Sequence, residues 1–161
     1  MTLLAIDPGN THSAYVVYDG AKPTAFAKLG NQELLDLLIT QNTASGDFAR
    51  VGHVAIEMIA SYGMPVGAEV FETCVWIGRY VQALDLPCQL VYRRDVKLHL
   101  CGQARAKDGN VRQALINRYG GKEAAIGRKA TPGPLYGISA DVWQALAVAV
   151  TAWETTTARA A

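Results

Sequence analysis

The sequence predicts an α/β domain built on a mixed five-stranded sheet flanked by helices, and two observations lead to this fold class. Apolar, β-favouring runs come first along the chain, and strand and helix patterns alternate after them. Two of the apolar runs end in a carboxylate, Asp7 and Glu57, and strand ends are where open α/β sheets gather their sites. We expect residues 1–161 to form one domain.

The first part of the chain favours an antiparallel meander followed by a helix. Turn residues follow the first two apolar runs, as Asp7-Pro8-Gly9-Asn10 and Asp19-Gly20. After the third run, Asn31 is a good N-cap, and leucines at helical spacing follow it. The expected elements are strands over residues 3–6, 14–18 and 24–29 and a helix over residues 31–39.

The second part predicts two further strands and three helices. Residues 41–52 form a polar connector, and residues 53–57 are short and apolar, as in a buried parallel strand. The expected elements after them are a Gly- and Pro-containing loop (59–67), a long helix (68–84), a strand (89–92), a helix N-capped by Asp108 (108–119), a mobile loop rich in Gly and Pro (122–137) and a final helix capped by Ser139.

Composition narrows the class of protein. Half of the 161 residues are hydrophobic and 18% are charged, which permits a sizeable core and argues against disorder. No uninterrupted apolar run approaches the roughly 20 residues of a membrane helix, and no basic leader precedes the first strand. We therefore expect a cytoplasmic protein without a membrane partner.

Positive charge is concentrated in one stretch although the net charge is only +1. Between Arg93 and Lys129 there are ten Lys and Arg residues against three acids. Such a stretch favours contacts with DNA phosphates, which position a protein without reading sequence; a solvated helix face is the alternative. The expected phosphate ligands are Lys97, Arg105, Lys107, Arg112 and, in the later loop, Lys129.

Three acids are candidate metal ligands. Asp7 and Glu57 end apolar strands, and Asp141 begins the last helical pattern. A carboxylate at the end of a buried strand is costly unless its charge is compensated, and Mg²⁺ prefers such oxygen ligands. Each acid taken alone is equally well explained as a turn or capping residue.

Four blocks of the sequence together resemble the RuvC-type Holliday junction resolvases of the RNase H-like superfamily, in particular their compact phage versions. The blocks occur in the family's order and span nearly the whole chain. They are Leu4-Ala5-Ile6-Asp7-Pro8-Gly9, Val54-Ala55-Ile56-Glu57, the basic segment from Tyr92 to Val111, and the segment from Asp141 to Val150.

The resemblance implies an RNase H-like fold and a catalytic site. Asp7, Glu57 and Asp141 correspond to acids that hold two Mg²⁺ ions, with Mn²⁺ as a substitute, for phosphodiester hydrolysis that leaves 5′-phosphate and 3′-hydroxyl ends. The family often carries a second acid three residues after the first in its last motif. Here Gln144 stands at that position, and its amide brings an oxygen but no charge.

The resemblance also implies a substrate and an assembly. Gly9 lets backbone approach the DNA, and Tyr62 and Met64 lie in the loop that meets the branch point of a four-way junction. An aromatic side chain there can stack on an unpaired base, or pack against its own domain. The two-fold symmetry of a junction implies a homodimer, for which the helix over residues 68–84 is the candidate interface.

Two other functions remain open from the residues. A non-catalytic module that binds branched nucleic acid would account for Gln144 as a lost ligand. A kinase or ATPase of the actin-like class would use the turn from Asp7 to Thr11 to hold phosphate, but such proteins need a second domain and a Gly-rich adenosine site. Junctions, other branched DNA and RNA–DNA hybrids are not distinguished by these residues.

Overall fold

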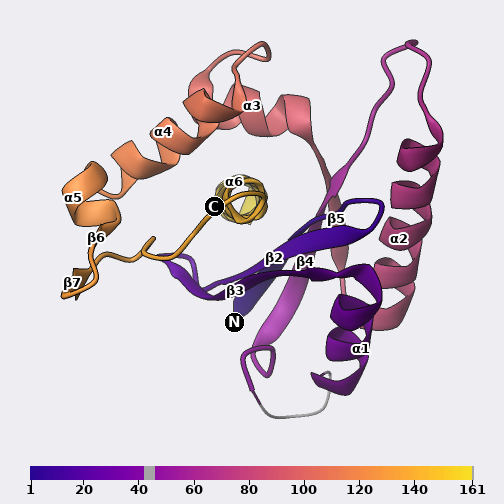
Figure 1. The fold of residues 1–161 in the computed structure, drawn as a ribbon, viewed down its shortest axis with the longest axis horizontal. Coiled ribbons are helices and arrows are strands. Elements are labelled where there is room, and N and C mark those ends of the chain that lie inside the picture. Colours follow the sequence, from indigo (N-terminus) through magenta and orange to yellow (C-terminus); the bar gives the residue numbers. More distant parts are fainter. Residues whose placement is uncertain (42–45, 161) are drawn as a thin grey trace.

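A five-stranded mixed sheet forms the centre of the computed structural model, which describes residues 1–41 and 46–160 (Figure 1). Its strand order is β3-β2-β1-β4-β5. The strands are β1 (Thr2–Asp7), β2 (His12–Tyr18), β3 (Pro23–Gly30), β4 (Val51–Met58) and β5 (Cys88–Tyr92). The first three are antiparallel neighbours, whereas β4 runs parallel to both β1 and β5. The predicted meander and mixed sheet are confirmed, and residues 42–45 of the predicted connector lie outside the described residues.

Helices cover both faces of the sheet (Figure 1). On one face lie α1 (Asn31–Gln41) and α2 (Ala68–Leu84). On the other lies α6 (Val142–Ala160), and α3 (Arg93–Cys101) and α4 (Asp108–Arg118) cross over it as a further layer. The helix expected over residues 68–84 is confirmed with the same bounds, and α1 and α4 agree with their predicted ranges to within two residues.

The alternation of side chains along β1 divides the core between the two faces. Leu4 and Ile6 are fully buried against α1 and α2, while Leu3 and Ala5 are buried on the α6 side. Successive side chains of a strand point to opposite faces, so Asp7 belongs to the α6 side. The last residue of β1 therefore carries its carboxyl group toward the face that α6, α3 and α4 cover.

The final helix, α6, is buried along most of its length because it lies between the sheet and α3–α4. Its first half consists almost entirely of buried apolar side chains, among them Ala145, Leu146 and Ala149 at 0% exposure. A helix that is apolar nearly all round is typical of such a sandwiched position. With 19 residues it is long, yet none of the described helices is both long and apolar enough to cross a membrane.

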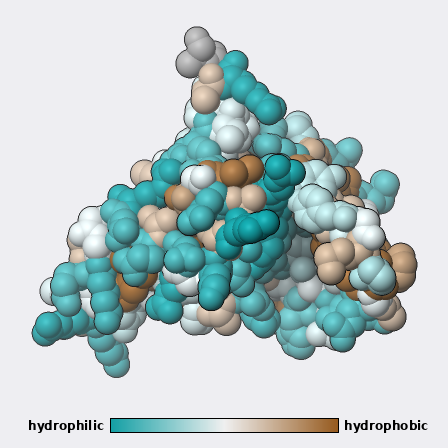
Figure 2. Space-filling view, turned by 90° about the horizontal axis from the view of Figure 1, so that it is seen from above, coloured by the Kyte–Doolittle hydropathy of each residue, from teal (hydrophilic) through white to brown (hydrophobic). Residues whose placement is uncertain are grey.

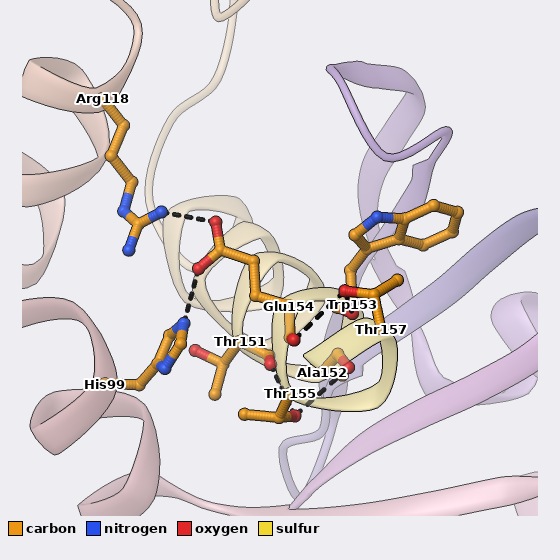
Figure 3. A network of polar contacts seen from close by, with 8 residues as sticks. All are labelled: His99, Arg118, Thr151, Ala152, Trp153, Glu154, Thr155 and Thr157. Atoms are coloured by element: carbon orange, nitrogen blue, oxygen red, sulfur yellow. Dashed lines mark hydrogen bonds and ion pairs between the residues drawn. The ribbon is translucent and has the colours of Figure 1, made fainter. Parts of the chain in front are cut away.

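One carboxylate on α6 holds the two overlying helices (Figure 3). Glu154 accepts from the His99 ring on α3 at 2.6 Å, and its other oxygen pairs with the Arg118 guanidinium on α4. The buried Val96, Leu115 and Ile116 pack the same helices onto the core. Glu154 thereby ties the C-terminal ends of α3 and α4 to α6.

The segment from residue 122 to residue 137 is more ordered than expected. It contains α5 (Lys122–Ala125) and a hairpin of β6 (Gly127–Arg128) and β7 (Thr131–Pro132). Ala125 and Leu135 are completely buried in the core, and Gly133 packs so closely that a Cβ there would lie 2.3 Å from the Ala125 carbonyl oxygen. The prediction of a mobile loop was wrong because Leu135, near the end of this segment, is buried in the core and anchors the Gly- and Pro-rich turns.

We predict that Leu146→Ala lowers the free energy of unfolding by about 2–5 kcal/mol, because Leu146 is completely buried between the sheet and α3–α4 and its removal leaves a cavity. Leu98→Ala is the matched control, since Leu98 is 42% exposed on α3 and its truncation should change stability by less than about 1 kcal/mol. Urea denaturation of both variants checks this, and equal losses would contradict the central position of α6.

Candidate active site at the carboxyl ends of β1, β4 and β5

Two acids lie side by side where neighbouring parallel strands end. Ile6 of β1 pairs with Ile56 of β4, so the next residues, Asp7 and Glu57, stand at the same level of the sheet. Both follow buried apolar residues and share the α6 side, by the alternation of each strand. The sequence prediction that brings these two carboxylates to one edge of the sheet is confirmed.

A buried polar network fixes the turn that follows Asp7. The Asn31 side-chain amide donates to the Gly9 carbonyl at 2.8 Å, and the Ser13 hydroxyl donates to the Asn31 side-chain oxygen at 2.7 Å. The Gly9 amide donates to Ser13, and the Tyr80 hydroxyl lies 3.2 Å from both the Ser13 and Asn31 side-chain oxygens. A Cβ at Gly9 would lie 2.3 Å from the His12 carbonyl oxygen. Gly9 is therefore required by its own turn, which holds Asp7 in place.

A cavity of about 520 Å³ opens above these strand ends. Acids and arginines both face it, from β1, from the starts of α3 and α4, and from the start of α6. The residues that line it are Asp7, Arg93, Asp108, Gly109, Arg112, Ile138, Ser139, Ala140, Asp141, Trp143 and Gln144. The cavity brings together Asp7, Asp141 and Gln144 from the predicted catalytic set and Arg112 from the predicted DNA contacts.

Glu57 is ion-paired at the edge of this cavity. Its side chain is buried, and both of its oxygens accept from one guanidinium nitrogen of Arg93, at 3.0 and 3.4 Å. The other terminal nitrogen of Arg93 lies 2.7 Å from the Asp108 carboxylate, and the Lys97 ammonium lies 4.0 Å from the same oxygen. Burial raises the pKa of Glu57, while the Arg93 charge acts in the opposite direction.

Asp108 does not cap its helix as the sequence suggested. Lys107 is the N-cap of α4, and the Asn110 side chain accepts from its backbone amide at 2.9 Å. Asp108 is the first residue of the helix, with its side chain turned to Arg93. The prediction was wrong because the partner of Asp108 is Arg93, 15 residues earlier in the chain at the start of α3.

Asp141 reaches the cavity from the N-terminus of α6. The helix begins at Val142, and the Asp141 carbonyl accepts from the Ala145 amide, so the start lies later than the predicted Ser139 cap. Ala140, just before it, has a left-handed φ of 46°, a costly conformation for a residue with a side chain. The Asp141 carboxylate forms a 2.5 Å ion pair with Lys28 of β3.

Lys28 belongs to the same level of the sheet as the acids. Asp7 pairs with Ala14 of β2, and Ala14 pairs with Lys28 of β3. Because directly paired residues point to the same face, Lys28 and Asp7 flank Ala14 on the α6 side. The small Ala14 side chain separates the two charges, and Lys28 turns to Asp141 instead.

Asp7 is the acid without a counter-ion. Among the described residues its carboxyl group has neither a hydrogen bond nor an ion pair. Burial, followed by the negative charge of Glu57, raises the pKa of Asp7 from 3.8 to about 8; Arg93 opposes this, and Asp141 and Asp108 add to it. The metal-free site therefore favours a proton on Asp7 at neutral pH.

The donor chemistry of the site suits a divalent ion, although two of its acids, Glu57 and Asp141, are paired with cations. Asp7, Glu57 and Asp141 offer hard carboxylate oxygens, which Mg²⁺ and Mn²⁺ prefer, and Gln144 adds an amide oxygen in the same cavity. Across residues 1–41 and 46–160, no three His, Cys, Asp or Glu side chains are gathered closely enough to hold a metal. Glu57 turns to Arg93 and Asp141 to Lys28, and release of these partners frees their oxygens.

The predicted DNA contacts divide into two groups. Arg112 lines the cavity with its guanidinium over the Trp143 ring, 5.0 Å from its centre, and Lys97 is partly buried beside Asp108. The others do not line the cavity and are exposed: Arg105 and Lys107 between α3 and α4, Lys129 between β6 and β7, and Tyr62 (66%) and Met64 (72%) in the β4–α2 loop. Tyr62 is thus not packed into its own domain.

The structure resembles solved RuvC structures over nearly its whole length. No protein-family model matches the sequence, and no curated protein matches it. Thermus thermophilus RuvC superposes with a TM-score of 0.68 at 20% identity, covering 98% of this chain and 97% of the other. T. thermophilus RuvC in complex with a Holliday junction substrate gives a TM-score of 0.67 at 19% identity, covering 98% and 96%. The chain has the RuvC-type RNase H-like fold. This confirms the predicted fold class.

Three residues of the site were missed from the sequence. Arg93 was assigned only to the basic stretch, Asp108 to a helix cap, and Lys28 to no site. The register of the meander is the signal that finds Lys28, since it places residues 7, 14 and 28 in one row. Arg93 directly follows β5, which is the neighbour of the strand β4 that carries Glu57 near its end, so the strand order indicates Arg93 as well.

We predict that the metal-free protein loses stability as the pH rises from about 4 to about 8. Asp7 is protonated in the folded protein over this range and ionised in the unfolded chain, so the folded state binds more protons. Urea denaturation in chelator at several pH values checks this. Asp7→Asn, which cannot ionise, should remove this part of the slope, and identical slopes in both proteins would contradict the raised pKa.

Proposed function

We propose that the protein is a metal-dependent endonuclease that cuts four-way and other branched DNA. The observation that supports this most directly is that Asp7 and Asp141 line one cavity together with Arg93 and Arg112, and that Glu57 is paired with Arg93 at its edge. Carboxylates to hold divalent ions and cations to hold phosphates are the two requirements of phosphodiester hydrolysis. The Holliday junction substrate in the similar T. thermophilus RuvC complex supports the choice of branched DNA.

Asp7, Glu57 and Asp141 are the proposed ligands of two Mg²⁺ ions, with Mn²⁺ as a substitute. Asp7 is placed for this role because it has no other partner among the described residues and its carboxyl group is held between like charges. Bound Mg²⁺ would supply an activated water and stabilise the departing oxygen, giving 5′-phosphate and 3′-hydroxyl ends. Gln144 lies in the cavity one helical turn after Asp141 and contributes a neutral oxygen, so the site holds its metal with less charge.

The proposed DNA surface surrounds the cavity. Arg112 and Lys97 lie next to the acids, and Arg105, Lys107 and Lys129 extend the positive surface over α4 and the β6–β7 hairpin. Seen from above, the side of the molecule that carries α4 and the β6–β7 hairpin, at the left as in Figure 1, is largely hydrophilic (Figure 2). Phosphates bound along these side chains would bring one strand of the DNA to the carboxylates.

The β4–α2 loop is proposed to meet the branch point. Hydrophobic surface gathers at the end of the molecule that carries this loop (Figure 2), where Tyr62 and Met64 are exposed. Tyr62 and Tyr92 line a groove of about 380 Å³ with Arg94. A base that is unpaired at a junction can stack on such an exposed aromatic ring.

The protein is proposed to act as a homodimer joined through α2. Phe71 and Val75 are more than 60% exposed, and Val75 lines an apolar groove between α1 and α2 with Leu35 and Ile39. Exposed apolar patches of this kind are typical of interfaces. A second copy of the chain is the proposed occupant, because two symmetry-related sites match the two strands cut in a four-way junction.

The proposed activity predicts paired nicks in a labelled synthetic four-way junction with Mg²⁺ or Mn²⁺ and none in chelator. Duplex, single-stranded DNA and RNA–DNA hybrid serve as comparison substrates. Junction binding without cleavage in either metal would instead support the non-catalytic binding module, and Gln144→Asp would then test whether the missing acid is the cause.

Asp7→Asn should lower the cleavage rate by more than about a hundredfold, since a ligand of the hydrolytic ions is worth several kcal/mol in the transition state. Junction binding, measured by gel shift, should persist. Asp19→Asn is the matched control, because the Asp19 carboxylate accepts two backbone amides in the β2–β3 turn and does not line the cavity. Retained cleavage by the Asp7 variant would remove this residue from the site.

Val75→Asp should convert the dimer to a monomer in analytical ultracentrifugation, because it places a charge in the apolar groove between α1 and α2. Val81→Asp makes the same change on the same helix outside that groove, where Val81 is 37% exposed, and should leave the dimer intact. Dissociation by the Val81 variant alone would place the interface elsewhere.

A further inference from the structure

Arg93 lines the cavity, was assigned from the sequence only to the basic stretch, and has no specific role in the chemistry proposed above. Its guanidinium forms hydrogen bonds at 3.0 and 3.4 Å with the buried Glu57 carboxylate and an ion pair at 2.7 Å with Asp108. One planar fork thus bridges the end of β4 and the start of α4. The same side chain lines the cavity that holds Asp7 and Asp141.

The two partners of Arg93 differ in how strongly they depend on it. The Glu57 side chain is 11% exposed, so its charge needs a nearby cation, whereas the Asp108 side chain is 58% exposed and also has Lys97 at 4.0 Å. A divalent ion at Glu57 would compensate the same charge that Arg93 compensates now. The guanidinium and the ion therefore compete for the same carboxylate oxygens.

We propose that Arg93 is an exchangeable counter-ion: it neutralises Glu57 in the metal-free protein, yields Glu57 to the incoming divalent ion, and then binds a DNA phosphate while Asp108 retains it. This inference rests on the metal-dependent function proposed above. Arginine suits the task because its planar fork has five donors, so one edge can keep Asp108 while another turns to a phosphate. Arg112, which lines the same cavity, would bind the phosphate chain alongside it.

The exchange couples metal binding to DNA binding. While Glu57 holds the guanidinium, the cavity presents fewer free donors to a phosphate. Once the ion occupies Glu57, the displaced charge faces the cavity and favours an anion there. Divalent ions should therefore raise the affinity for DNA through a residue that does not itself hold the metal.

Mn²⁺ binding in the absence of DNA tests the competition. Arg93→Gln should bind Mn²⁺ at least about threefold more tightly than the unaltered protein in electron paramagnetic resonance titrations, since the ion no longer displaces an ion pair. Arg94→Gln removes the same charge one residue away, from a side chain that faces a different groove, and should change Mn²⁺ affinity by less than about twofold. Unchanged or weaker Mn²⁺ binding by Arg93→Gln would overturn the proposal.

Thermal unfolding separates this role from a merely structural one. In chelator, Arg93→Gln should unfold at a lower temperature than the unaltered protein, because Glu57 is left buried without its cation. Saturating Mn²⁺ should raise its unfolding temperature by more than it raises that of the unaltered protein. A defect that Mn²⁺ does not reduce would assign Arg93 to the fold alone.

Calcium tests the second half of the exchange, because a junction can be bound in Ca²⁺ while cleavage is followed separately in Mg²⁺. Ca²⁺ should strengthen junction binding several-fold in the unaltered protein and in Arg50→Gln, a control whose exposed side chain precedes β4 at the opposite end of the strand from Glu57, and by less than about twofold in Arg93→Gln. An equal gain in all three proteins would overturn the role of Arg93 toward phosphate. Loss of Mn²⁺ binding in Asp7→Asn, measured in parallel, tests the proposed metal site itself, so its failure is distinguishable from failure of the exchange.

Discussion

The compensation of buried negative charge at one edge of the sheet is the constraint on which the site depends. Strand pairing places Asp7 and Glu57 at one level, and α6 brings Asp141 to the same cavity. Asp7 and Glu57 are shielded from bulk water, and two carboxylates so placed cannot both remain ionised without a cation, whereas the Asp141 side chain is 51% exposed. Lys28 and Arg93 compensate two of them, and a raised pKa removes the charge of the third.

The layers of the fold cover the ends of β1 and β4 and leave one cavity open above them. A mixed sheet with apolar residues on both faces needs helices on both sides. The helix α6 covers the face toward which the acids point. Its small alanines let it lie deep between the sheet and α3–α4. The cavity remains where the sheet, the start of α6 and the starts of α3 and α4 meet.

The sequence was sufficient for those features that depend on local pattern. The apolar runs before Asp7 and Glu57 predicted the strands, and the position of the acids at strand ends predicted their meeting. The cations that pair with the acids could not be found in this way, because they are far away in the chain. Lys28 precedes its partner Asp141 by 113 residues, and Arg93 follows its partner Glu57 by 36 residues. The hairpin in residues 122–137 was missed because the Gly and Pro content of this segment indicates turns. The segment is ordered by the burial of Leu135 in the core, which local sequence pattern does not reveal.

Glu154 and Asp141 make α6 a link between two parts of the molecule that lie at its opposite ends. At 1.5 Å per residue, the 13 residues from Asp141 to Glu154 span about 20 Å, so one straight rod carries an acid of the cavity at one end and the anchor of α3 and α4 at the other. A chain shortened after Ala152 would keep every acid of the cavity but lose the grip on the overlying helices. The set of acids in the cavity and the attachment of α3 and α4 to α6 are thus separable by where the chain is cut.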